Sequence, residues 1–323
     1  MLKAKILDFL TRSDAFAPIR FLNRQKFPIL MYHRFSRGEE PGKTSRETFE
    51  SHLHYLTKHY KMISLDELVE YKRNGEPLPL RSAVITIDDG YRDFYEIAFP
   101  LLKKFNLPAT LYVVTGFIEG ENWIWTDKAR YILGNTSAEL CDVVVGSKKI
   151  ATTLGDSESR LTAAGSINSE LKKMPDEEKD ATLREIASRM NVDIPDLPPD
   201  QFEALGWDEA REMRDANVEI GSHTANHPIL TNVDEERLVN ELQASKSMLE
   251  DKLQKQSIHF CYPNGNVSKR ERDAAENTGY ASAVTTELRL CENSDDRFLL
   301  PRIDAEPEMH RFVQATSGFD RMK

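Results

Sequence analysis

The sequence predicts an α/β fold with parallel strands, of a size that suits an α/β barrel of roughly 250 residues with an insertion. The run Ala83–Ile87 has the continuous β-branched hydrophobicity of a strand that is covered on both faces. A similar run returns at Ala109–Val114 after a helical pattern, which indicates a right-handed βαβ unit. The chain has 323 residues, 40 % of them hydrophobic, and can therefore bury a sizeable core.

Other segments are expected to add strands to the same sheet. These are Phe27–His33, Val218–Gly221, the stretch that begins at Ile258, Tyr280–Thr285 and Phe298–Ile303. The β/α alternation is interrupted over residues 119–204, where a hairpin pattern and two polar helical patterns follow an aromatic-rich opening. We therefore expect an N-terminal helical segment (1–26), a barrel (27–118 and 205–323) and an insertion (119–204). The insertion could shape the substrate site or serve as a stabilising surface subdomain.

The composition of the chain restricts the classes of partner that we expect and the compartment in which we expect the protein. Forty-three basic and 53 acidic residues give a net charge of −10, which argues against nucleic acid as a partner. The three cysteines are far apart in the sequence and predict no disulfide framework. No apolar run reaches the length of a signal peptide or a membrane span, so we expect a cytoplasmic protein, free or at the inner membrane face. An amphipathic pattern at Ile6–Leu10 is expected to pack on the domain. The oligomeric state is not predicted.

Two adjacent carboxylates end the central strand. Asp88 and Asp89 follow Ile87 directly, and Gly90 lets the chain turn. This carboxyl end is where α/β barrels and open α/β sheets place catalytic groups. Neighbouring side chains on a strand point in opposite directions, so the two carboxylates can have different roles. The alternative is an ordinary Asp-Asp-Gly turn.

Two histidines follow another predicted strand. His223 and His227 are four residues apart, a spacing that can place both imidazoles on one face of a helical turn. With Asp89 they form a His₂Asp set, which suits a divalent metal with an open position for water. Zinc fits this set best, and cobalt, nickel or iron would suit the same ligands.

Two further stretches carry candidate functional residues. In the turn Tyr262–Gly265, Pro263 and Gly265 fix the chain direction, and Asn264 between them can present a backbone N–H to an oxyanion. The alternative is a plain strand-terminating turn. His33 ends the first predicted strand and would lie on the same rim as Asp88, although a structural histidine is equally consistent with its position.

These motifs resemble the polysaccharide deacetylase family, also called the NodB-homology or carbohydrate esterase family 4 enzymes. Thr86–Gly90, Ser222–Pro228 and Tyr262–Gly265 are similar to its first three motifs, and the resemblance covers residues 27–117 and 205–301. It implies a distorted (β/α)₇ barrel that removes N-acetyl groups from an N-acetylated oligo- or polysaccharide. Met31–Phe35 resembles the subgroup that acts on poly-N-acetylglucosamine exopolysaccharide.

The resemblance also implies roles for individual residues. Asp88 would be the base, and Asp89, His223 and His227 the metal ligands. The backbone N–H of Tyr262 would stabilise the oxyanion, and we assign substrate binding to Pro263, Gly265 and Arg302. The subgroup implies His33 as general acid. His310 is the alternative, although it lacks the leucine of the family's C-terminal motif.

Two other functions agree with the same residues. One is a metal-dependent hydrolase of another amide, such as a cyclic ureide. The other is a barrel that binds carbohydrate without turnover. Acetate release from N-acetylglucosamine oligomers, with and without a chelator, separates the three.

Overall fold

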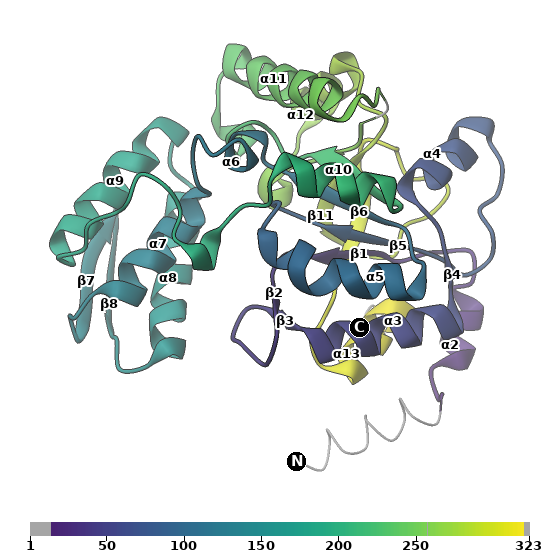
Figure 1. Cartoon of the computed structure of the whole chain (residues 1–323), viewed down its shortest axis with the longest axis horizontal. Helices are drawn as coiled ribbons and strands as arrows, with labels where there is room; N and C mark the ends of the chain where they lie inside the picture. The colour runs from purple at the N-terminus through teal and green to yellow at the C-terminus, as the bar shows by residue number, and fades with distance from the viewer. Residues whose placement is uncertain (1–13, 257, 320–323) are drawn as a thin grey trace.

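A closed parallel barrel forms the body of the protein in the computed structural model, which describes residues 14–256 and 258–319 (Figure 1). Eight strands form one sheet in the order β1-β12-β11-β10-β9-β6-β5-β4, and pairing of β1 with β5 closes seven of them into the barrel. The seven are β1 (Ile29–Tyr32), β5 (Ser82–Ile87), β6 (Ala109–Val113), β9 (Val218–Ser222), β10 (Phe260–Cys261), β11 (Ala283–Leu288) and β12 (Leu300–Asp304). Every residue of β5 is buried, as its apolar run predicts. The predicted barrel is confirmed.

Helices cover the outside of the barrel. They are α2 (Ala17–Leu22), α3 (Arg46–His59), α4 (Leu65–Asn74), α5 (Phe99–Phe105), α6 (Thr115–Ile118), α10 (Trp207–Asp215), α11 (Glu235–Leu253), α12 (Lys269–Thr278) and α13 (Met309–Ser317). Local sequence sets several of their ends. Ser45 caps α3, and Ser64 and Glu67 form a capping box at α4. The predicted helix at residues 6–10 lies outside the described residues.

Short elements complete the fold. They are β2 (Phe35–Ser36), β3 (Thr44–Ser45), β4 (Lys61–Met62), the π-helical turn η1 (Phe94–Ala98) and the 3₁₀ turns η2 (Asp200–Phe202), η3 (Leu230–Asn232) and η4 (Pro263–Gly265). Among the described residues, no helix combines the length and the apolarity that crossing a membrane requires.

The insertion has an apolar core of its own. Helix α7 (Trp125–Asn135), the hairpin β7 (Leu140–Val145) and β8 (Lys148–Thr153), α8 (Ser157–Leu171) and α9 (Asp176–Arg189) enclose it. The predicted hairpin and polar helices are therefore present. Residues of β7 alternate between exposed and buried, because one face of the hairpin packs on the helices. In Figure 1 this subdomain lies beyond α6, the helix that follows the carboxyl end of β6.

Two residues at the start of α7 attach the insertion to the barrel loops. The indole Nε1 of Trp125 donates to the carbonyl of His227 at 3.1 Å. The carboxylate of Asp127, which is fully buried, accepts from the hydroxyl of Tyr91 and from Nη1 of Arg130. Tyr91 follows the Asp-Asp-Gly turn, so α7 contacts the loops after both β5 and β9.

We predict that Asp127→Ala lowers the free energy of unfolding by about 1–3 kcal/mol, because it leaves the buried Tyr91 hydroxyl without its acceptor. Urea unfolding measures the change. Glu185→Ala is the control, because Glu185 forms an exposed ion pair with Arg189 within α9. Equal midpoints for Asp127→Ala and the control would contradict the prediction.

Candidate metal centre and active site

Three ligand atoms converge at the carboxyl ends of β5 and β9. Oδ1 of Asp89 lies 3.6 Å from Nε2 of His223 and 3.7 Å from Nε2 of His227, and the two nitrogens are 3.2 Å apart. Ligands at about 2.0–2.2 Å from a tetrahedral zinc ion are about 3.3–3.6 Å from one another. The structure therefore brings the predicted His₂Asp set together at a spacing that fits a metal ion.

The loops that carry the candidate metal ligands contain residues in a backbone conformation that residues other than glycine rarely adopt. Asp89 and His227 have φ of 80° and 59°, in the left-handed region. The carboxylate of Glu241, on α11, accepts from the backbone N–H groups of Ala225 and Asn226 at 3.0 and 2.8 Å and from the side-chain amide of Asn226 at 2.9 Å. These bonds, together with that from Trp125, hold the strained loop in place.

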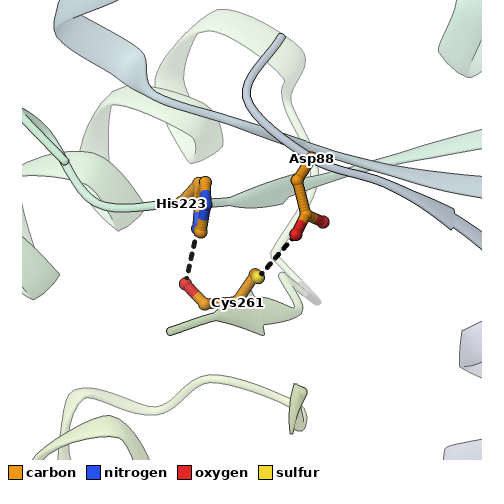
Figure 2. Close-up of side chains that lie close together, drawn as sticks. All are labelled: Asp88, His223 and Cys261. Atoms are coloured by element: carbon orange, nitrogen blue, oxygen red, sulfur yellow. Dashed lines mark hydrogen bonds between the residues drawn. The ribbon is translucent and has the colours of Figure 1, made fainter. Parts of the chain in front are cut away.

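The hydrogen bonds of His223 set its tautomer. Its Nδ1 lies 2.8 Å from the carbonyl of Cys261, which can only accept, so Nδ1 carries the hydrogen and Nε2 presents a lone pair (Figure 2). Burial lowers the pKa of His223 and lowers that of His227 further, with the neighbouring His223 adding to the effect. Both imidazoles are therefore neutral at pH 7, which is the form that binds metal.

The carboxylate of Asp88 pairs with Arg302 and lies within 4.8 Å of a ring nitrogen of His223. Nη1 and Nη2 of Arg302 each donate to one carboxylate oxygen of Asp88 at 2.7 Å. Burial alone would raise the pKa of Asp88, but the charge and hydrogen bonds of Arg302 hold it well below its usual range. The prediction that Arg302 binds substrate is wrong, because its side chain is fully buried and already bonded to Asp88.

The two candidate acids lie in different places. His33, directly after β1, has Nε2 at 3.8 Å from Oδ2 of Asp88, and its side chain is 48 % exposed. His310 lies on α13, which packs against α3 in the outer layer. The geometry thus places His33 beside Asp88.

The structure of the turn after β10 contradicts the role predicted for one backbone N–H group. The backbone N–H of Tyr262 donates to the carbonyl of Val284 at 3.3 Å, within the pairing of β10 and β11. The predicted oxyanion role for this N–H is therefore wrong. Asn264 has a left-handed φ of 59°, and a Cβ on Gly265 would lie 1.9 Å from Oγ1 of Thr286, so glycine is required there. Pro263 is buried, and its predicted contact with substrate remains a prediction.

Sequence reasoning missed three residues that support the site, namely Cys261, Trp125 and Glu241. The thiol of Cys261 lies beside Asp88 (Figure 2), with its sulfur 3.5 Å from Oδ2 of Asp88 and 3.2 Å from Nη2 of Arg302. Because the guanidinium of Arg302 already supplies a cation beside Asp88 and Cys261, we do not assign a metal to these two side chains. A signal existed for Glu241, which is three residues after the buried Leu238 and so falls on the apolar face of α11.

Comparisons with known proteins agree with this geometry. The polysaccharide deacetylase family model matches residues 75–283. YxkH of Bacillus subtilis is 23 % identical over 301 residues, covering 92 % of this chain and 77 % of that protein. The poly-β-1,6-N-acetyl-D-glucosamine N-deacetylase of Staphylococcus aureus is 40 % identical over 104 residues, which is 32 % of this chain and 34 % of the relative.

Two solved structures have the same fold. The structure of IcaB from Ammonifex degensii aligns with a TM-score of 0.61 and 19 % identity, covering 91 % of this chain and 97 % of that one. The Streptococcus pyogenes deacetylase PplD, in complex with acetate, aligns with a TM-score of 0.60 and 20 % identity over 90 % and 98 % of the two chains. The sequence match and the barrel agree: the chain belongs to the polysaccharide deacetylase family.

Proposed function

We propose that the protein hydrolyses N-acetyl groups of an N-acetylhexosamine-containing saccharide and releases acetate. The observation that carries the proposal is the convergence of Asp89, His223 and His227 beside a separate ionised carboxylate, Asp88, and a half-exposed His33. The local match to poly-β-1,6-N-acetyl-D-glucosamine N-deacetylases makes β-1,6-linked N-acetylglucosamine the first substrate to test.

Asp89, His223 and His227 would hold the divalent metal, with zinc favoured by two imidazoles and one carboxylate. A bound cation of this kind polarises a carbonyl oxygen and lowers the pKa of a water ligand to about 7. Both imidazoles are neutral, and the tautomer of His223 leaves the lone pair of its Nε2 free to bind the metal.

Asp88 is the proposed base. Arg302 keeps it ionised, so it can accept the proton that the attacking water loses. A carboxylate with a lowered pKa holds that proton weakly and passes it on readily. Nε2 of His33, 3.8 Å away, is the nearby group proposed to receive it.

His33 is the proposed acid for the departing nitrogen. An amine leaves poorly as an anion, so the imidazolium of His33 donates a proton as the C–N bond breaks, and the amino sugar and acetate are the products. Since the N–H of Tyr262 is engaged in the sheet, the N–H of Asn264 is the proposed protein donor to the oxyanion.

We predict that His223→Ala, His227→Ala and Asp89→Ala each lose bound metal, whereas Asp88→Asn keeps metal and loses turnover. Metal content after dialysis and acetate release from β-1,6-linked N-acetylglucosamine oligomers measure the two effects. His54→Ala, at an exposed position on α3, is the matched control.

Circular dichroism must accompany Asp88→Asn, because an unpaired buried charge such as Arg302 can cost about 3–5 kcal/mol. Full metal occupancy in either histidine variant would refute the site. Chelator-resistant acetate release by the parent would refute the metal dependence.

We predict that His33→Ala lowers the rate of amide hydrolysis by ~10²–10⁴ with metal still bound. His310→Ala should stay within a few-fold of the parent. An activated ester should largely rescue His33→Ala, because its leaving group needs no proton. Equal loss on ester and amide would show that His33 is structural, and a large loss in His310→Ala would reverse the assignment.

A further inference from the structure

A cavity of about 710 Å³ lies between the barrel and the insertion. This volume falls within the range of about 300–1,000 Å³ that is usual for ligand pockets. The barrel lines it with Arg34 and the loop around Lys43, and the insertion lines it with parts of α7 and α8.

Two residues that line the cavity are linked to residues of the candidate centre. Arg34 directly follows His33, the proposed acid. On the insertion side, Nδ2 of the lining residue Asn168 donates to the carbonyl of Thr126 at 3.0 Å. The preceding residue, Trp125, donates to the carbonyl of the ligand His227. The insertion wall of this cavity is therefore connected through α7 to the loop that carries His227.

The lining supplies hydrogen-bond donors. Arg130 and Arg160 line the cavity, and each uses a single nitrogen, Nη1, for its bonds to Asp127 or to the carbonyls of Leu133 and Thr136. Within residues 14–256 and 258–319, their other guanidinium nitrogens have no hydrogen-bond acceptor. These nitrogens can donate to hydroxyl and acetamide oxygens.

The lining also has an apolar part. Phe202, near the end of the insertion, is largely buried next to the guanidinium of Arg34, and Leu161 on α8 is 38 % exposed. A pyranose ring combines hydroxyl groups at its rim with apolar C–H faces, so it matches donors beside an aromatic and an aliphatic surface. A single acetamide is too small to use both.

We propose that this cavity is a subsite for the saccharide chain next to the N-acetylhexosamine unit that reacts. The inference rests on the proposed function and deepens it. The substrate is then an oligomer or polymer rather than a lone N-acetylhexosamine. The insertion makes the binding affinity depend on chain length.

Two glycines allow the cavity to be filled without disturbing the fold. Gly134 on α7 and Gly165 on α8 line it, and a Cβ at either position meets no atom within 4 Å. Both lie inside helices, where most residues suit the backbone better than glycine. Gly134→Phe and Gly165→Phe should therefore fold and occupy the cavity. Ala181→Phe, at an exposed position on α9 outside the lining, is the control.

Calorimetry on the metal-free 323-residue chain measures binding of a β-1,6-linked N-acetylglucosamine pentamer and of the monomer. We expect the parent and Ala181→Phe to bind the pentamer more tightly than the monomer. In both glycine variants, the Kd for the pentamer should rise by about tenfold or more, the change that loss of a few contacts produces.

Unchanged pentamer binding in both glycine variants would overturn the subsite, as would a parent that binds the pentamer no better than the monomer. Acetate release by the metal-loaded parent separates this result from the proposed function. Binding in the cavity without acetate release would refute the function alone. Acetate release at equal efficiency from monomer and pentamer would refute the subsite alone.

Discussion

The buried ion pair between Asp88 and Arg302 is the interaction on which the arrangement of the site depends. It joins the residue after β5 to the middle of β12, and these two strands flank β1 in the closed barrel. With Asp88 held in the fork of the guanidinium, the next residue, Asp89, faces the two histidines. Two adjacent carboxylates thereby receive separate environments, one paired with a cation and one open to a metal. Such a pair adds little net stability over apolar residues, but it fixes one geometry.

The insertion is part of the same arrangement. A single helix, α7, contacts the loop after β5 through Asp127 and Tyr91 and the loop after β9 through Trp125 and His227. The second loop is also held by Glu241 of α11, which accepts from two of its backbone N–H groups. The left-handed conformation of His227 is thus held by residues from two parts of the chain that are distant in sequence. Through these bonds the insertion contacts both loops that carry candidate metal ligands.

The strands and site residues that could be predicted from the sequence are those that a local residue pattern determines. Ala83–Ile87 is apolar because both faces of β5 are covered, and polar residues directly after parallel strands must meet at one rim, which brought Asp89, His223 and His227 together. The errors arose where long-range pairing decides. Whether the N–H of Tyr262 is free depends on the register of β10 with β11, and the role of Arg302 depends on which strand closes beside β1. A short motif indicates neither the register of β10 nor the strand that closes beside β1. A lone arginine in the apolar strand Leu300–Asp304 does, however, indicate a buried counter-charge.

We infer that Arg302 keeps the proposed base, Asp88, ionised and does not hold the metal ligands in place. Cobalt titration of Arg302→Lys, together with its rate of acetate release, tests this claim directly, since lysine keeps the positive charge but loses the two-pronged contact. The Kd for cobalt should stay near that of the parent while the rate of acetate release falls. A loss of cobalt affinity as large as that in His223→Ala would contradict it, and would show that the ion pair holds the metal centre itself.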